Sequence, residues 1–513
     1  GRIAGHLGLG NLIMFYDANE VQLSTMVDAV DTEDVAAKYR AWQWNVIEID
    51  GNDPLAIADA LTKANECNGR PTLIIGHTRM GLGAVTASGE NFEGKCSTHG
   101  QPLSKSGADY AKTVENLGGD PQDPWQIWPE VAALYAKRQE ELRMTVKERR
   151  AVYDAWTKEN PDAAQQLDNY INGRLPKIDW DSITVKANSA TRNASSAVLA
   201  ELSSKIGNMI VSSADLCNSD KTDGFLKHTT EIRRGDFSGA FLQAGVAELT
   251  MAVIMNGIAV HGGVMAACGT FFVFSDYMKP AIRMAALMEL PVKYVWSHDA
   301  FRVGEDGPTH EPVEQEAQIR LLEQMNNLSG HPSMLVLRPA DSAETIVAWQ
   351  MAMENDSTPT ALILSRQDVN DIPSVTGVRA HEAQGARHGG YVICDCAEPA
   401  VTLVANGSEV SLCCEAAARL SEEGIGVRVV SIPSIGLFNQ QSKEYRESVI
   451  PVHGKVLGFT AGLPSTLRAI KGWHGEVYGL ERFGASAPYK VLDEKFGFTA
   501  DNAVLQIRNI IEN

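Results

Sequence analysis

The stretch PVKYVWSHDAFRVGEDGPTHEPVEQEAQIRLLEQM, residues 291–325, carries the most informative pattern in the chain. Its apolar start, residues 291–296, predicts a buried strand, and residues 313–325 predict a helix. Residues 298–312 between them predict a loop with two histidines, an arginine and several acids, in which Gly and Pro fix the turn. Open α/β sheets bind ligands at the carboxyl ends of their strands, whereas an arbitrary acidic loop is more often solvated surface.

Strands alternate with helices on both sides of this stretch. The strands are expected at residues 12–17, 45–49, 71–75, 209–213, 271–274, 292–296, 334–337, 361–365, 401–404, 427–430 and 455–459. Such alternation is typical of α/β proteins with parallel sheets. A chain of 513 residues also suggests three domains at ~150 residues each. We therefore predict three parallel-type α/β domains, with α/β alternation at about 11–78, 191–370 and 388–513 and a charged helical segment at about 129–172.

Bulk composition narrows the class of partner. A net charge of −19 argues against nucleic acid as the main partner, although a locally basic site can still bind an anionic substrate. No apolar run reaches ~18 residues, so no membrane span is expected. The eight cysteines show no pair of CxxC motifs at zinc spacing, which favours free thiols in a reducing cytoplasm.

Glu248 is the sharpest single candidate for chemistry. It lies in a segment, residues 245–261, that is apolar nearly all round and is expected to form a helix buried on most sides. A carboxylate in such a place is costly unless it is paired or protonated. Glu248 is therefore either a helix N-terminal glutamate stabilised by the helix dipole or an acid that exchanges a proton with a buried ligand.

Aromatic and amide side chains provide two weaker candidates. Phe271, Phe274 and Tyr277 are spaced by three and predict either core packing or a pocket for a flat heteroaromatic ring. Asn19 follows the strand at 12–17, where it is either a turn residue or a hard oxygen ligand for Mg²⁺.

Two arginines point to an anion site. Arg192, Ser219 and Arg366 each follow or end an element that faces the same strand ends as His298. Single arginines are usually surface residues, but these four together would make a hydrogen-bonding clamp for a phosphate.

Several motifs resemble transketolase. They are HGG at 261–263, GEDGPTHEPVEQ at 304–315, ALILSRQ at 361–367, GLGNLI at 8–13 with FYD at 15–17, and residues 207–216 ending in SADL. The stretch at 304–315 is highly specific, and the resemblance runs along essentially all 513 residues. It implies transfer of a two-carbon ketol unit from a ketose phosphate to an aldose phosphate, in the pentose phosphate pathway of the cytoplasm. It also implies thiamine diphosphate with Mg²⁺, or Ca²⁺ or Mn²⁺, as cofactors.

The resemblance further implies a domain plan and a homodimer. Residues 1–130 would be the later part of the diphosphate-binding domain, 185–375 the pyrimidine-binding domain and 388–513 the C-terminal domain. The first two share the thiamine diphosphate-binding fold. Each active site would lie at the subunit interface, between the diphosphate domain of one subunit and the pyrimidine domain of the other.

Cofactor-binding roles are implied by the same resemblance. Glu248 matches the glutamate that bonds a pyrimidine-ring nitrogen and begins catalysis, and Asp215 lies in the matching cofactor-side turn. The aromatic pocket for the ring would consist of Phe271, Phe274 and Tyr277. His99 matches a catalytic histidine near the diphosphate, and the metal ligands would be Asn19 and the carbonyl of Val21.

Substrate-binding roles are implied in the same way. His310 matches a catalytic histidine near the reacting centre, and His99 would also contact the substrate there. His298 and Asp306 match residues that contact sugar hydroxyls. The phosphate clamp would consist of Arg192, Ser219 and Arg366.

The sequence departs from the family at several positions. Ala247 stands where the family has Arg, Glu20 where it has Gly, and AACGT at 266–270 where it has PYTST. The family's Gly-Asp-Gly motif, with a metal-binding Asp, would lie before Gly1, in a segment of ~160 residues if that domain has the usual size. The strand at 12–17 is accordingly expected inside a parallel sheet, and these 513 residues alone are expected to bind thiamine diphosphate poorly.

Other functions stay open. Dihydroxyacetone synthase and 1-deoxyxylulose-5-phosphate synthase are related thiamine enzymes, and the clamp with His298 and Asp306 favours transketolase over the second. The absence of a Gly-Asp-Gly motif from the 513 residues favours a different class, a non-catalytic dimerisation or interaction remnant.

Overall fold

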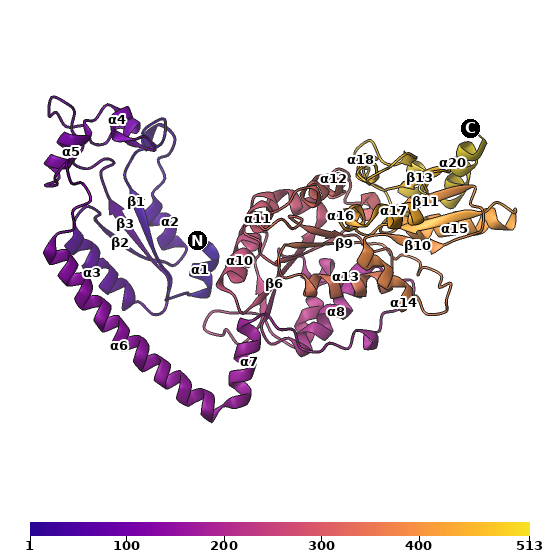
Figure 1. Ribbon diagram of the computed structural model, residues 1–513, viewed down its shortest axis with the longest axis horizontal. Helices are drawn as coiled ribbons and strands as arrows, with labels where there is room; N and C mark the ends of the chain where they lie inside the picture. The colour runs from indigo at the N-terminus through magenta and orange to yellow at the C-terminus, as the bar shows by residue number, and fades with distance from the viewer. Residues whose placement is uncertain (513) are drawn as a thin grey trace. The chain divides into compact units, whose positions relative to one another are not determined.

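A computed structural model describes residues 1–512 and confirms an α/β fold with three sheets (Figure 1). The chain forms two compact units. The first holds residues 1–164 and 233–237, and the second holds residues 165–232 and the chain from Ser238 onward.

The first unit contains a three-stranded parallel sheet in the order β1-β3-β2. Its strands are β1 (Ile13–Ala18), β2 (Asn45–Asp50) and β3 (Thr72–His77). Within these residues β1 is an edge strand with partly exposed apolar side chains, and the expectation that further strands pair with it stays a prediction.

Side-chain caps set the helix starts in this unit. Asp34 caps α2 by accepting a hydrogen bond from Ala37, and Asp53 caps α3 with Pro54 as the first helical residue. The helices are α1 (Arg2–Leu7), α2 (Val35–Ala41), α3 (Pro54–Asn65), α4 (Leu103–Ser106), α5 (Tyr110–Asn116) and α6 (Pro129–Glu159). No residue of α6 is buried.

The second unit begins with a six-stranded, all-parallel sheet in the order β5-β4-β6-β7-β9-β8. The strands are β4 (Met209–Ser213), β5 (Phe241–Gln243), β6 (Met265–Phe271), β7 (Lys293–Ser297), β8 (Leu335–Leu337) and β9 (Thr360–Leu364). β4 pairs with β5 on one side and with β6 on the other, so the strand order reverses direction at β4. Such a reversal leaves a crevice at the carboxyl ends of β4 and β6, where α/β sheets bind ligands.

Helices cover both faces of this sheet (Figure 1). On one face α8 and α13 pack together, and on the other α10 packs against α11. The helices of this part of the chain are α7 (Pro161–Ile171), α8 (Thr191–Lys205), α9 (Cys217–Asp220), α10 (Glu248–His261), α11 (Ser275–Leu287), α12 (Gln315–Arg320) and α13 (Ser342–Glu354).

Two sequence predictions in this region are wrong. Residues 272–274 form a 3₁₀ turn, and the strand is the preceding run Met265–Phe271. The small residues of this strand gave no apolar run by which the sequence could predict it. A small residue is required at Gly269, because a side chain there would collide with Asp220 and Thr222. Helix α10 is not buried on most sides, since Val253 and Val260 are more than half exposed.

The C-terminal sheet is mixed and not parallel throughout. Its order is β10-β12-β11-β13-β14, and β10 runs antiparallel to β12. The strands are β10 (Tyr391–Cys394), β11 (Val401–Ala405), β12 (Val427–Ser431), β13 (Val456–Phe459) and β14 (Glu476–Tyr478). The helices are α14 (Arg379–Ala383), α15 (Glu409–Glu422), α16 (Ile435–Gln440), α17 (Lys443–Val449), α18 (Ser465–Arg468), α19 (Tyr489–Phe496) and α20 (Ala500–Glu512).

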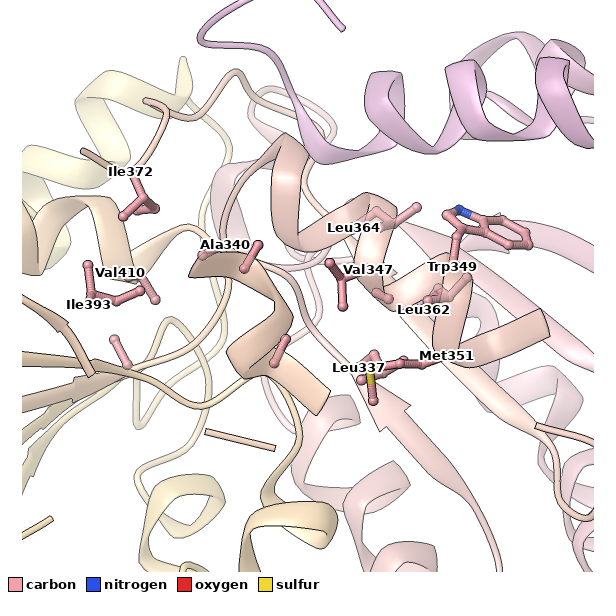
Figure 2. Packing of buried hydrophobic residues seen from close by; sticks show 14 of the residues in the cluster. Leu337, Ala340, Val347, Trp349, Met351, Leu362, Leu364, Ile372, Ile393 and Val410 are labelled. Atoms are coloured by element: carbon pink, nitrogen blue, oxygen red, sulfur yellow. The ribbon is translucent and has the colours of Figure 1, made fainter. Parts of the chain in front are cut away.

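One hydrophobic core joins the six-stranded and C-terminal sheets. Figure 2 shows Leu337, Leu362 and Trp349 in the same cluster as Ile393 and Val410 of the C-terminal part. The Trp349 indole N–H also donates to Ser195 Oγ at 2.9 Å. Because burial of this area drives folding, the two sheets are held as one body.

Two bulk predictions can be compared with the structure. All eight cysteines are free thiols. Among residues 1–512 no helix has both the length and the apolar character that a membrane span requires.

Candidate active site

The carboxyl edge of the six-stranded sheet gathers side chains that are far apart in sequence. Ser219 follows β4, Phe271 ends β6, His298 follows β7 and Arg366 follows β9. Glu248 begins α10 directly after β5. Parallel strands bring all of these positions to one edge of the sheet. The sequence predicted this place for the loop at residues 298–312. We call this loop the site loop.

An aromatic stack forms the floor of the site. The Phe271 ring lies on the His298 ring with centroids 3.6 Å apart, and Phe274 lies 5.9 Å from Phe271. Tyr277 continues the stack 6.0 Å from Phe274. The His310 ring stands edge-on to Phe274 at 5.3 Å. The three aromatic residues are thus adjacent, and Phe271 and Phe274 also contact the two histidines of the site loop.

His298 is held in an uncommon backbone conformation. Its φ angle is 63°, which is rare for a non-glycine residue and typical of functional turns. The side chain is buried, and its Nδ1 lies 2.8 Å from Ser297 Oγ. Burial, together with Arg192 and Arg366, lowers the pKa of His298 to about 2. The imidazole is therefore neutral at physiological pH, and its Nδ1 is the nitrogen engaged by Ser297.

Arg192 and Arg366 lie close enough for their charges to interact, and Asp368 and Asp220 also act on Arg192. Arg192 Nη1 donates to the Ser219 carbonyl at 2.7 Å and lies 3.4 Å from Ser219 Oγ. Its Nε is buried without a partner among the described residues. Burial and the nearby Arg366 lower the pKa of Arg192. A phosphate would pair with both guanidinium groups and remove this mutual repulsion.

Glu248 is buried and is the first residue of α10. Its position at the helix N-terminus agrees with the dipole interpretation. Its carboxylate nevertheless has no hydrogen bond or ion pair within residues 1–512. An unpartnered carboxylate at the ligand edge of the sheet is available to a buried ligand, so both interpretations stay open.

Other expected residues are placed less decisively. Thr309 Oγ1 lies 2.9 Å from His310 Nδ1, which fixes that ring. Asp306 is exposed in the site loop. Asp215 occupies the left-handed region, with φ 67°, in the exposed turn after β4.

Residues expected to bind the diphosphate and metal lie in the first unit. Asn19 follows β1, and its Oδ1 accepts a hydrogen bond from the Val21 N–H at 3.1 Å, as in an Asx turn. Val21 pairs with Met26, against which Cys96 packs, so the segment before His99 lies beside the same loop. His99 Nδ1 is buried without a partner among the described residues.

The site residues differ in how well they fit the implied cofactors. Buried polar atoms without partners near the strand ends belong to Arg192, Thr270, Ser275 and Gln367. With the aromatic stack and Glu248, they suit a flat heterocycle and an anion. In contrast, no three His, Cys, Asp or Glu side chains within residues 1–512 are arranged to hold a metal. Asn19 and the Val21 carbonyl supply only two oxygens, fewer than the octahedral shell of Mg²⁺.

Two further polar residues were not predicted. Asp220 is fully buried and accepts hydrogen bonds from Ser213 Oγ at 2.7 Å and Thr222 Oγ1 at 2.6 Å, which shapes the turn after β4. Glu311, next to His310, is buried with both carboxylate oxygens unpaired among the described residues. Burial raises its pKa to about 7. Its place in the site loop was the only sequence signal for it.

Three family models match successive parts of this chain. Residues 1–176 match "Transketolase, thiamine diphosphate binding domain", and residues 187–371 match "Transketolase, pyrimidine binding domain". Residues 389–499 match "Transketolase-like TK C-terminal domain". A transketolase of Halalkalibacterium halodurans is 38% identical over 524 residues, covering 100% of this chain and 74% of the relative. The chain belongs to the transketolase family.

Solved transketolases share this architecture. The transketolase from Leishmania mexicana matches with a TM-score of 0.89 at 33% identity, covering 100% of this chain and 73% of that one. The transketolase of Pichia stipitis in complex with sedoheptulose 7-phosphate matches with a TM-score of 0.87 at 31% identity, with the same coverage. This transketolase-family chain therefore spans about three quarters of the length of these relatives.

Proposed function

We propose that a protein containing these 513 residues transfers a two-carbon ketol unit from a ketose phosphate to an aldose phosphate. The observation that carries this proposal is the pairing of Arg192 and Arg366 beside a neutral His298 at the strand ends. Two neighbouring guanidinium groups favour a phosphate, and a neutral histidine next to them favours a hydroxyl-bearing carbon chain. A sugar phosphate satisfies both.

The substrate is held by three groups of this chain. Arg192 and Arg366 bind the phosphate, while Ser219 fixes the Arg192 guanidinium. His298 donates to or accepts from a sugar hydroxyl through Nε2, since Ser297 engages Nδ1. We assign Asp306 to a second hydroxyl and His310 to the oxygen at the reacting carbon, where it moves a proton. The buried Phe271 ring beside His298 keeps water from that side of the sugar.

Thiamine diphosphate, when bound, supplies the nucleophilic carbon needed to break the carbon–carbon bond beside a ketose carbonyl. We assign its pyrimidine ring to Phe271, Phe274 and Tyr277, with Asp215 in the adjoining turn. Glu248 would exchange a proton with a ring nitrogen, which the absence of a protein partner for its carboxylate within residues 1–512 supports.

Residues of the first unit complete the proposal. His99 would serve the diphosphate and the reacting oxygen, which its unpaired Nδ1 supports. Asn19 and the Val21 carbonyl would be two ligands of a divalent cation, Mg²⁺, Ca²⁺ or Mn²⁺. These residues do not make a complete metal site, and no step above depends on the metal.

We also propose a homodimer. An apolar stripe formed by Leu249, Val253 and Val260 is exposed on α10, with Val246 just before the helix. Met284 and Leu287 are exposed on the neighbouring α11, and Met288 directly follows it. Contiguous exposed apolar surface marks a protein interface. A second copy would cover it and bring the first unit of one subunit to the pyrimidine-binding unit of the other. From the resemblance to transketolases, we also propose that the protein acts in the pentose phosphate pathway of the cytoplasm.

Family resemblance also supports a plan of domains. We assign residues 1–130 to the later diphosphate domain, 131–184 to a helical linker, 185–375 to the pyrimidine domain and 388–513 to the C-terminal domain.

A second candidate function is a non-catalytic dimerisation module. The lack of a three-residue metal cluster within residues 1–512 favours it. An assay with thiamine diphosphate, Mg²⁺, sedoheptulose 7-phosphate and a ¹³C-labelled aldose phosphate separates the two. Ketol transfer appears as labelled sugar lengthened by two carbons. A protein that dimerises and binds the sugar phosphate without any transfer is the module.

A further inference from the structure

The site loop is anchored from behind by side chains that do not face the substrate. Asp299 and Arg302 are both buried, although each lies within four residues of His298. Arg302 reaches into the C-terminal part of the chain, where its Nη1 donates to Glu409 Oε1 at 2.7 Å and its Nε donates to Asp493 Oδ1 at 2.6 Å. The loop is thus tied directly to α15 and α19.

A second arginine ties the same loop to the same glutamate. Arg338 follows β8 and is fully buried. Its Nη2 donates to Asp299 Oδ2 at 2.7 Å, and its Nη1 donates to Glu409 Oε2 at 2.7 Å. Each oxygen of Glu409 therefore holds a different arginine, and both arginines lead back to the residues just after His298.

Glu409 is the ionised centre of this network. Its side chain has no exposed surface, and it is the first residue of α15, where the helix dipole favours a negative charge. Burial disfavours its charge, but Arg338 and Arg302 hold the pKa of Glu409 down at about 2. Removing this charge would leave two buried guanidinium groups short of a partner, which is far more disruptive than losing a surface pair.

The position of His298 depends on the next residue in the chain, Asp299. The positive φ of His298 is retained only if the surrounding structure holds the backbone there. Arg338 binds the Asp299 carboxylate through two nitrogens, at 2.7 and 3.1 Å. The network is thus the main polar restraint on the loop at the point where His298 enters the site.

We propose that Glu409, acting through Arg302 and Arg338, is a positioning residue for the site loop, so that the C-terminal domain sets recognition of the sugar. This inference rests on the proposed function, because it assigns His298 to a sugar hydroxyl. It gives the C-terminal domain a role in substrate selection beyond packing.

The test compares Glu409→Gln with the wild type by two independent measurements. Calorimetry gives the affinity for sedoheptulose 7-phosphate and for inorganic phosphate. Glu409→Gln should weaken sugar phosphate binding by about tenfold, the scale of energetic coupling through a packed network, and leave inorganic phosphate within about twofold. Hydrogen exchange should accelerate in residues 299–312 but not in β7 or β9.

Two further variants control for folding. Glu415→Gln removes an exposed partner of Arg419 from the same helix, and both measurements should match the wild type. Asp493→Asn neutralises the other, partly exposed partner of Arg302 and should reproduce the loop effect in a milder form. If Glu409→Gln does not fold, the Asp493→Asn variant tests the positioning role in its place.

The outcomes separate the inference from the proposed function. Unchanged loop exchange in both Glu409→Gln and Asp493→Asn, with unchanged sugar affinity, overturns the positioning role. Equal losses of sugar phosphate and inorganic phosphate also overturn it, since they indicate general damage. If the wild type itself binds sedoheptulose 7-phosphate no better than phosphate, the proposed function fails, while the exchange measurement still tests the anchoring of the loop.

Discussion

Thr191 and Ser365 exchange hydrogen bonds across the carboxyl edge of the six-stranded sheet. The Ser365 N–H donates to Thr191 Oγ1 at 2.7 Å, and the Thr191 N–H donates to Ser365 Oγ at 3.0 Å. Both side chains are buried. Arg192 follows Thr191 at the start of α8, and Arg366 follows Ser365 just after β9. The Thr191–Ser365 pair therefore holds the start of α8 against the end of β9 and sets the spacing of the two guanidinium groups.

Thr191→Val should therefore weaken phosphate binding, although Thr191 itself is not a proposed phosphate ligand. The substitution leaves the buried Ser365 N–H without its acceptor, which costs roughly 1–3 kcal/mol of stability. Calorimetry with inorganic phosphate should show weaker binding than in the wild type. Thr345→Val, which deletes a comparable buried hydroxyl bonded to the Asp341 carbonyl, should lower stability but leave phosphate affinity unchanged. Equal phosphate affinity in Thr191→Val and the wild type would argue against the pair as a spacer.

Glu248→Gln should preserve the fold and slow proton exchange at the thiazolium carbon of bound thiamine diphosphate by at least ~100-fold. This is the usual scale for a positioned acid–base group, which the amide cannot replace. NMR of the cofactor proton in deuterated buffer measures the rate. Glu201→Gln in α8 is the matched control and should exchange at the wild-type rate. If Glu248→Gln also exchanged at that rate, the helix-dipole interpretation alone would be sufficient.

Val253→Asp should dissociate the proposed dimer. Val253 is 52% exposed in the middle of the apolar stripe on α10, so a charge there would have to be buried on association. Sedimentation velocity should detect monomers for Val253→Asp and dimers for the wild type. Leu328→Asp alters a residue that is 86% exposed in a loop and should remain dimeric. A dimer that survives Val253→Asp would place the interface elsewhere.

Glu311→Gln should stabilise the protein at alkaline pH. Because the folded-state pKa of Glu311 is raised to about 7 from its usual value near 4.5, the folded state loses stability as pH rises from about 4.5 to 7. Above that range an unpaired buried carboxylate costs roughly 1–3 kcal/mol, which the neutral amide avoids. Urea unfolding at pH 8.5 should show the gain, and at pH 4.5, the lower end of that range, most of it should disappear.

The exposed Glu305 in the same loop provides the control for this comparison. Glu305→Gln should have no pH-dependent effect on unfolding, since its side chain stays in water. An equal gain at pH 4.5 and pH 8.5 for Glu311→Gln would mean that packing, and not ionisation, is responsible.

Much of the fold was predictable from hydrophobic periodicity. Strands such as Met209–Ser213 are short apolar runs between turn residues, and the alternation with helices correctly predicted α/β units. Prediction failed where small residues replaced apolar ones, as in Met265–Phe271, and where strand direction mattered, as in the antiparallel β10. Periodicity reports which residues face a core but not which strand lies beside which.

The site was predictable to a similar extent. The site loop and the residues at strand ends stood out because parallel strands must bring them to one edge. The partners behind the site did not, since Glu409 lies 107 residues from Arg302 in sequence. Burial of an ion pair leaves no periodic signal, and neither the Thr191–Ser365 pair nor the unpaired Glu311 could be read from spacing alone.

The central claim is that the strand-end arginines bind the phosphate of a sugar. Calorimetry of Arg192→Ala and Arg366→Ala with sedoheptulose 7-phosphate and with the non-phosphorylated sugar sedoheptulose tests it most directly. Each variant should lose roughly 1.5–3 kcal/mol of affinity for the phosphorylated sugar, the range for a charged hydrogen bond, and almost none for the other. Arg508→Ala, which removes an exposed partner of Glu423, should change neither. Equal losses for both sugars, or no loss for either, would contradict the claim.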